Sequence, residues 1–144
     1  MEINDISTTD FCGKAKFLRG LKKREKIFAN KILDYKVDGE TNRELLAKTN
    51  FDIKFFDSKK SKSEDTLYLS TNINYLVKKR QEVLDCKDVQ MHEIDITAGT
   101  KQGAQKLREV ISKINHDIED RYPMQYNNNS QKFLIKTAMF LGIL

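Results

Sequence analysis

The sequence predicts an α+β fold that is predominantly α-helical, with four to five helices and a possible small two- to three-stranded sheet. The first reason is a helical period over residues 101–121, where large apolar residues recur three and four positions apart. The second is composition, since one Pro and six Gly are few for a fold rich in turns. The third is alternation of apolar residues over 51–56, which is typical of a strand. The length fits one domain, 1–144, in which we expect 1–9 to be a flexible leader.

The first predicted helix covers residues 10–35 and would be capped by Thr8 or Thr9. Its apolar residues form one stripe. Gly20 weakens such a helix by about 1 kcal/mol relative to Ala, so the start can instead fall near Leu21.

A turn signal, Val-Asp-Gly-Glu at residues 37–40, follows this helix. Thr41 and Glu44 then have the spacing of a capping box and open a short helix that ends near residue 49. The two helices and the turn predict either a helix-turn-helix or a plain helical hairpin.

The middle of the chain leaves two alternatives open. Residues 66–72 either belong to a helix that starts at Ser63 or form a strand that pairs with 51–56, and we favour the strand. Helically spaced apolar residues predict a helix over 73–85. With a strand at 89–96, this order is that of a β-α-β unit.

A short polar turn leads into the central helix, residues 101–121. Thr97 or Thr100 is the expected N-cap, and Gly99 is free to take a positive φ. The apolar side of this helix is the predicted centre of the core: Leu107, Val110, Ile111, Ile114 and Ile118.

The last predicted helix, residues 131–144 with Ser130 as cap, is the most apolar segment of the chain. Its apolar residues lie on more than one side, so it must be buried either in the core or against another chain. The candidate oligomer-interface residues are Phe133, Leu134, Met139, Phe140 and Leu141.

The net charge of +5 is unevenly distributed, because the whole positive excess lies in residues 1–80. Such a surface would bind phosphates in a salt-sensitive, sequence-independent way. The candidate nucleic-acid-binding residues are Lys14, Lys16, Arg19, Lys22, Lys23, Arg24 and Lys26.

The turn before the central helix has the amide groups, hydroxyls and lysine that suit an anion. The candidate ligand-binding residues are Thr97, Gly99, Thr100 and Lys101.

Residues 95–101 resemble the Thr-Gly-Gly-Thr-Lys loop of CARF domains, the Rossmann-like sensors of cyclic oligonucleotides, with Ala98 in place of one glycine. The resemblance implies a small α/β sensor of a nucleotide ligand. Residues 21–49 resemble the DNA-binding opening of phage terminase small subunits, which implies a DNA-binding helix-turn-helix.

Catalysis is not indicated, because neither His92 nor His116 has the neighbours of an acid-base or nucleophilic site. Cys12 and Cys86 are isolated and indicate free thiols in a reducing compartment. We therefore expect no catalytic residue, no metal and no cofactor. Without a secretory signal or an apolar run of membrane-spanning length, we expect a cytoplasmic protein.

The function predicted from the sequence is that of a non-enzymatic interaction or assembly module. It would self-associate, or bind a partner protein, through its apolar C-terminal helix. The first alternative is a nucleic-acid-binding protein that uses the basic N-terminal helix. The second alternative is the nucleotide-ligand sensor.

Overall fold

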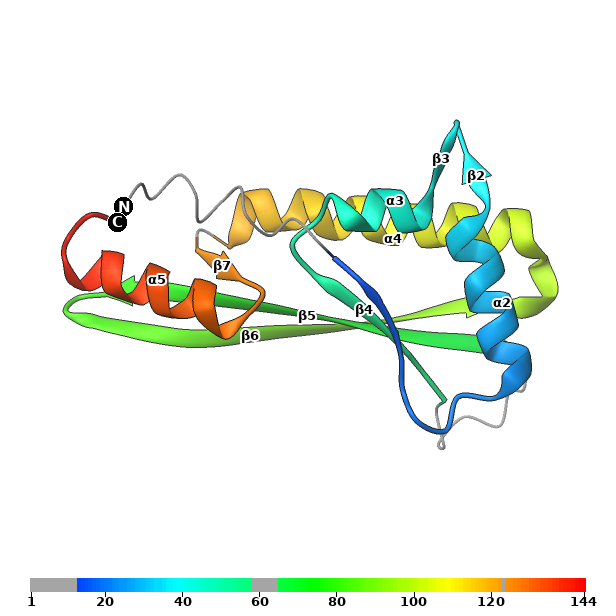
Figure 1. Cartoon of the computed structure of the whole chain (residues 1–144), viewed down its shortest axis with the longest axis horizontal. Coiled ribbons are helices and arrows are strands. Elements are labelled where there is room, and N and C mark those ends of the chain that lie inside the picture. The colour runs from blue at the N-terminus through cyan, green and yellow to red at the C-terminus, as the bar shows by residue number, and fades with distance from the viewer. Residues whose placement is uncertain (1–12, 58–64, 123) are drawn as a thin grey trace.

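The computed structural model describes residues 13–57, 65–122 and 124–144, which form a curled mixed sheet and helices (Figure 1). The pairing of residues 15–17 with residues 53–55 is parallel, and the other pairings in this sheet are antiparallel. Its order is β1-β4-β5-β6, and β7 pairs with β5 beyond the end of β4. The strands are β1 (Ala15–Phe17), β4 (Asp52–Phe56), β5 (Thr66–Lys79), β6 (Glu82–Asp95) and β7 (Gln125–Tyr126).

Four α-helices, one 3-10 helix and a small hairpin complete the described part of the chain. The helices are α2 (Lys23–Asp34), α3 (Asn42–Ala47), η1 (Ile96–Ala98), α4 (Thr100–Arg121) and α5 (Asn129–Phe140). The hairpin of β2 (Lys36–Val37) and β3 (Glu40–Thr41) separates α2 from α3. The predicted leader 1–9, with its caps Thr8 and Thr9, lies outside the described residues, as does Cys12.

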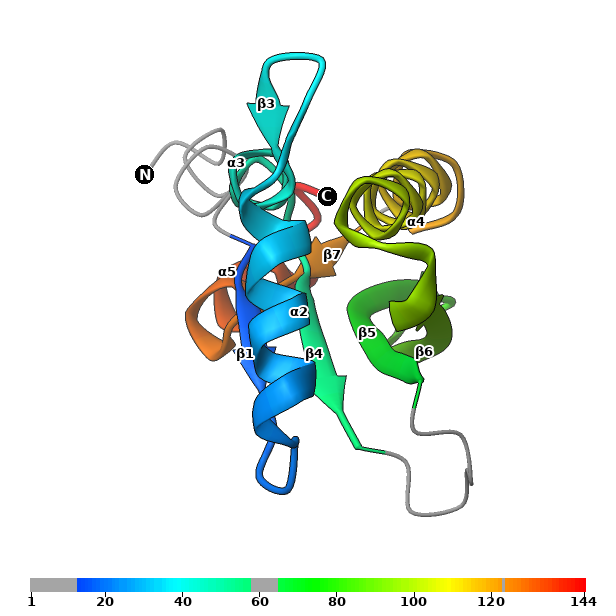
Figure 2. The same cartoon turned by 90° about the vertical axis from the view of Figure 1, so that its right-hand side faces the viewer.

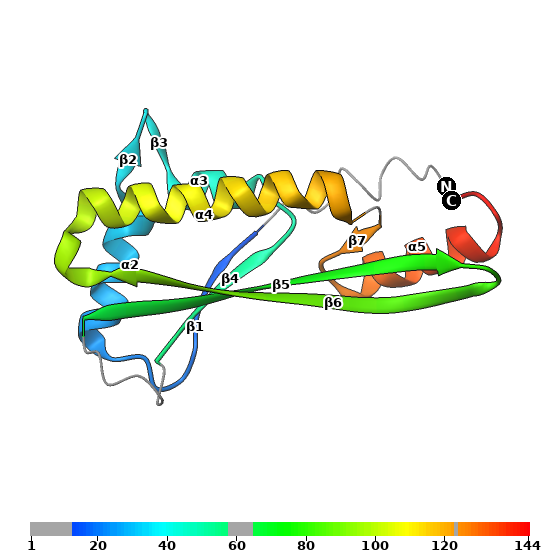
Figure 3. The same cartoon turned by 180° about the vertical axis from the view of Figure 1, so that it is seen from behind.

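The prediction of a predominantly helical fold with a small sheet is wrong. Of the described residues, 44% are helical and 34% are in strands, and the sheet has five strands. The main error is the helix predicted over 73–85. These residues instead form the outer half of a long hairpin, the half that contains its turn. In that hairpin β5 and β6 pair along their whole lengths, and Lys79 lies opposite Glu82 (Figure 3). The β-α-β order is wrong for the same reason.

Strand β5 is buried on different faces along its length, which explains the error. Up to Ile73, the buried side chains of β5 alternate and point toward α4. Leu76 is then buried on the opposite face, in a second core with α5. This change of face puts two buried apolar residues three positions apart, which is the spacing of a helix.

The helix predicted over 10–35 is also wrong at its start, because α2 begins only at Lys23, two residues after the alternative start near Leu21. The preceding residues form β1, which pairs with β4 and stacks Phe17 on Phe55 with ring centroids 5.6 Å apart. A Cβ at Gly13 would lie 2.4 Å from the carbonyl oxygens of Leu46 and Phe51. This part of the chain therefore lies extended against α3 and β4, and only glycine fits at its closest approach.

Helix α4 packs its apolar side against the sheet and α2. The five predicted core residues are all buried: Leu107, Val110, Ile111, Ile114 and Ile118. They contact the main core of buried side chains from β4 and β5. Burial of each such side chain stabilises the fold by about 1.5–3 kcal/mol.

The second core lies between α5 and the outer half of the long hairpin. Its buried members are Leu76, Tyr126, Ile135 and Met139. The cap of α5 is Asn128, whose side chain accepts a hydrogen bond from the Gln131 amide, and not the predicted Ser130. Helix α5 therefore packs one of its sides against the hairpin and leaves the other side exposed.

The buried side-chain amide of Asn42 on α3 forms hydrogen bonds with both α2 and α4. The Nδ2 of Asn42 donates to the carbonyl oxygens of Ile32 and Ala104, at 2.9 and 2.8 Å. Close by, a Cβ at Gly103 would lie 2.8 Å from Cζ of Phe28. The contact between α2 and α4 therefore depends on the lack of a side chain at Gly103 and on the buried side-chain amide of Asn42.

The turn and capping box predicted after the first helix are both present. Asp38 and Gly39 have φ of 54° and 83°, which fits the two positive φ values of a type I′ hairpin turn. The Thr41 hydroxyl accepts the Glu44 amide at 3.1 Å. A β-hairpin, and not a short loop, thus joins α2 to α3, unlike the predicted helix-turn-helix or helical hairpin.

Candidate functional site

The predicted ligand-binding turn lies between β6 and α4. Asp95 Oδ1 accepts hydrogen bonds from the amide and the hydroxyl of Thr97, at 2.9 and 2.7 Å. These bonds lower the pKa of the Asp95 carboxyl. The N-cap of α4 is Gly99, with φ of 90°, and not the predicted Thr97 or Thr100, so no side chain caps the first amide groups of the helix.

A hollow of about 230 Å³ joins this turn to the basic helix α2. It is lined by Gly99 and Thr100 from the turn, and by Arg24 and Lys31 from α2. Figure 2 faces the side on which α2 lies and shows the start of α4 beside it. The structure thus brings the turn after β6 and the basic helix α2 together, although they lie about 70 residues apart in the sequence. Thr97 and Lys101 do not line the hollow.

The predicted nucleic-acid-binding residues lie just before β1, on β1, on the loop after it and on the first turn of α2, and all are exposed. Two of them form ion pairs, Lys16 with Asp52 and Arg24 with Asp65, both at 3.1 Å. The others have no ion-pair partner among the residues that the structure describes: Lys14, Arg19, Lys22, Lys23 and Lys26.

The predicted oligomer-interface residues divide between the two sides of α5. Phe133, Phe140 and Leu141 are exposed, whereas Leu134 is half-buried. Met139 is buried in the second core and does not reach the surface. The outward side of α5 is therefore apolar at its two phenylalanines and at the residues after its end.

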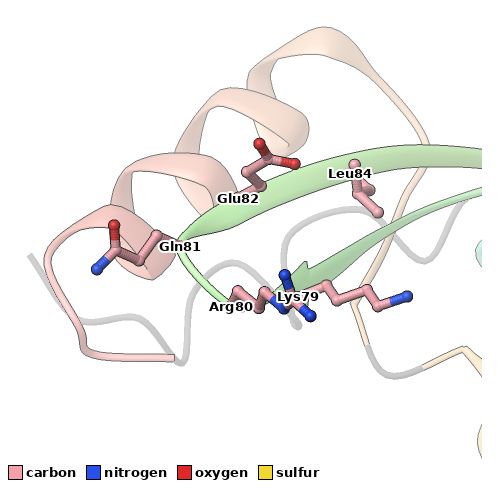
Figure 4. Close-up of a pocket in the computed structure, with 5 residues that line it drawn as sticks. All are labelled: Lys79, Arg80, Gln81, Glu82 and Leu84. Atoms are coloured by element: carbon pink, nitrogen blue, oxygen red, sulfur yellow. The ribbon is translucent and has the colours of Figure 1, made fainter.

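A second hollow, of about 740 Å³, lies at the tip of the long hairpin and is lined by Lys79, Arg80, Gln81, Glu82 and Leu84. Figure 4 shows the side chains of Gln81 and Lys79 pointing away from each other, while α5 passes behind the tip. Since these side chains do not converge on one point, the hollow is a poor site for a small ligand.

His92 borders another hollow, of about 470 Å³, together with Tyr68, Glu93 and Lys106. Burial, and then the charges of Lys106 and Lys113, lower the pKa of the imidazole. As the sequence indicated, His92 and Glu93 are neighbours on a strand, so their side chains point to opposite faces of the sheet. No serine, threonine or cysteine is among the residues that line this hollow beside the imidazole.

A cluster that the sequence did not indicate lies where α4 ends over the hairpin. The Tyr122 hydroxyl donates to Asp88 on β6, and its ring packs on Tyr75 of β5. Burial, followed by the bond to Asp88, raises the pKa of Tyr122 to about 12. No periodic signal marks the cluster, because its members come from three separate elements.

On the other face of the hairpin, Asp85 connects β6 to α5. Its carboxylate accepts a hydrogen bond from the Tyr126 hydroxyl and pairs with Lys132. These two contacts, Lys132 first, lower the pKa of Asp85. The pair fixes α5 on the hairpin and leaves no free carboxylate there for chemistry.

Two general properties bear on the function. In the described part of the chain, no three His, Cys, Asp or Glu side chains gather in a way that would hold a metal ion. Among the same residues, no helix is both long and apolar enough to span a bilayer.

Comparisons of the chain with known protein families, with curated proteins and with solved structures find no match. The described fold is that of a mixed helix-and-strand protein in which a long hairpin carries a core on each face. Its two notable surfaces are the basic region of α2 and the apolar outward side of α5.

Proposed function

We propose that this protein is an assembly module that self-associates through the outward side of α5. The observation that carries the proposal is the exposure of two phenylalanines on one helix, 69% for Phe133 and 88% for Phe140. The segment after the helix extends this surface. We name the whole surface the C-terminal apolar face: Phe133, Phe140, Leu141, Ile143 and Leu144.

The C-terminal apolar face is carried by a fixed backbone. Gly142 has φ of 76°, and its amide donates to the Met139 carbonyl at 3.1 Å. The Ile143 amide donates to the Ala138 carbonyl at 2.9 Å. These two bonds are those of a Schellman motif, which ends a helix in a defined way. These bonds fix the backbone that carries the apolar side chains, and exposed apolar patches rimmed by polar residues mark interaction sites.

A second copy of the chain suits this surface because the surface is self-complementary. Phe133 and Phe140 are two helical turns apart, on the same side of α5. In a two-fold arrangement of antiparallel α5 helices, each Phe133 lies beside the partner's Phe140, so the same patch serves both protomers.

Charge does not favour a different kind of partner. Lys132 is engaged by Asp85, and α5 contains no acidic residue. Lys136 is exposed, and its long side chain can turn its ammonium group to water at the rim of the interface. The face therefore offers no charge pattern that would select an unlike protein.

Sedimentation velocity at micromolar concentrations tests the proposal. We expect the parent protein to sediment as a dimer whose fraction rises with concentration, and the Phe133→Ser, Phe140→Ser double variant to sediment as a monomer. Ile27→Ser is the matched control, because Ile27 is also an exposed apolar residue, 46% accessible, but lies on α2. A parent that remains a sharp monomer at every concentration would exclude self-association.

A further inference from the structure

The first turn of α2 carries several positive charges, of which only Arg24 has an ion-pair partner among the described residues, Asp65. Lys22 is the N-cap of the helix, and Lys23, Arg24 and Lys26 follow within one turn. The N-terminus of a helix already carries a partial positive charge, so acidic residues stabilise it and lysines do not. Lys22 and Lys26 are also four positions apart, where like charges repel. This arrangement costs stability unless an anion is present.

The one acidic residue of that turn does not neutralise this charge on the surface. Glu25 is 4% exposed, and its carboxylate accepts the Lys22 amide at 3.0 Å. It thus caps the helix from the buried side. The lysines around it keep their charge directed to solvent.

The opposite end of α2 is built differently, which shows that the chain does pair its charges elsewhere. Arg43 bonds Asp34 at 2.9 Å, and Arg108 bonds Glu40 at 3.0 Å. Lys48 also pairs with Glu40, and Lys48 and Arg108 together lower the pKa of the Glu40 carboxyl. Unpaired lysines also lie elsewhere among the described residues, such as Lys31 and Lys113, but the start of α2 and the loop before it bring four unpaired cations together within eight residues: Arg19, Lys22, Lys23 and Lys26.

The exposed cations of α2 follow one side of the helix. Lys23, Ile27 and Lys31 are four positions apart and share this side, with Lys26 and Arg24 at its two flanks. Lys23 and Lys31 are separated by about 12 Å along the helix axis. That length spans about three to four phosphates of one nucleic-acid strand.

We propose that this surface binds the phosphate backbone of nucleic acid without reading its sequence. We name it the basic face, and its members are Arg19, Lys22, Lys23, Arg24, Lys26 and Lys31. A nucleic-acid backbone supplies closely spaced negative charges, whereas the described part of the fold supplies this turn with one exposed carboxylate, Asp65 beside Arg24. The proposal is independent of self-association, because the basic face belongs to α2 and the apolar face to α5.

Fluorescence anisotropy with a labelled 24-base-pair DNA duplex of mixed sequence tests the proposal across a salt series. The parent should bind at about 50 mM salt, and its affinity should fall linearly on a double logarithmic plot. Reversal of Lys22, Lys23 and Lys26 to Glu should abolish binding. Replacement of the same three by Gln should reduce the slope by about 0.9 for each phosphate contact that is removed.

A thermal melt of the unliganded variants separates binding from folding. The Glu variant should melt at the same temperature as the parent or higher, because glutamates suit the start of a helix. The matched control reverses three exposed lysines that lie elsewhere, Lys79, Lys87 and Lys113, and should retain binding despite the same change in net charge.

Three results would overturn the proposal. They are a parent that does not bind at about 50 mM salt, a control that loses binding as fully as the reversal, and a folded Gln variant that binds like the parent. The whole series is repeated in the Phe133→Ser, Phe140→Ser background, so that failure of self-association and failure of DNA binding are seen separately.

Discussion

The rings of Tyr75 and Tyr122 lie 4.6 Å apart, centroid to centroid, where helix α4 ends over the long hairpin. The Tyr122 amide still donates to the Ile118 carbonyl at 3.2 Å, while its hydroxyl reaches Asp88 on β6. The last turn of α4 is therefore attached to both strands of the hairpin.

Tyr122→Phe should keep the ring contact and lose the hydrogen bond, at a cost of about 1 kcal/mol at neutral pH. Folding raises the pKa of Tyr122 to about 12. Its stabilising contribution is therefore complete below about pH 10, the unfolded pKa, and is lost between pH 10 and 12. Urea unfolding over that range should show the parent losing stability faster than the Phe variant. Equal losses would contradict the assignment.

Ile111→Ala and Ile114→Ala should each lower the free energy of unfolding by about 2–5 kcal/mol. Both side chains are fully buried between α4 and the sheet. Lys113→Ala, at an exposed position of the same helix, should change it by less than about 0.5 kcal/mol. An isoleucine variant that melts within a degree or two of the parent would refute the packing of α4.

Gly103→Ala should destabilise the fold, although Ala is better than Gly by about 1 kcal/mol inside a helix. The new Cβ would lie 2.8 Å from Cζ of Phe28 and 2.9 Å from Cγ2 of Ile32, and such overpacking costs about 1–3 kcal/mol. Chemical denaturation measures the change. In a Phe28→Leu background, which removes the ring atom, the penalty should be smaller. A stabilising Gly103→Ala would show that α2 and α4 do not approach so closely.

Asp85→Asn should loosen α5 from the hairpin, because it weakens the contacts with Lys132 and Tyr126. Hydrogen exchange of the α5 amides at pH 7 should become faster than in the parent. Folding lowers the pKa of Asp85, so its contribution is present above about pH 3.8 and is lost as the pH falls through the folded pKa. The difference between parent and variant should therefore shrink in acid, and a pH-independent difference would refute the ion pair.

Local signals determined much of the helical part of this protein. Helix α4 was predicted almost to the residue, because one buried side over 22 residues produces a strong period. The turn at Asp38 and Gly39 and the capping box of Thr41 and Glu44 were predicted from single residue types. Each of these features depends on residues that are neighbours in the chain, so the sequence determines them directly.

The residues of the two candidate surfaces were also evident from the sequence, but their arrangement was not. Arg24 and Thr100 line one hollow only because α2 packs on the start of α4. Met139 was grouped with Phe140, yet the helix places the first in the core and the second at 88% exposure. Which side of an all-round apolar helix is buried depends on what packs against it.

Tertiary structure alone decided the long hairpin. Leu76 is buried because α5, more than 50 residues later in the chain, covers that face of β5, while α4 covers the other face near Ile73. A strand that is buried first on one face and then on the other loses the alternation that identifies it. The pattern of buried residues follows the helices that cover the strand, and that information lies outside the strand's own sequence.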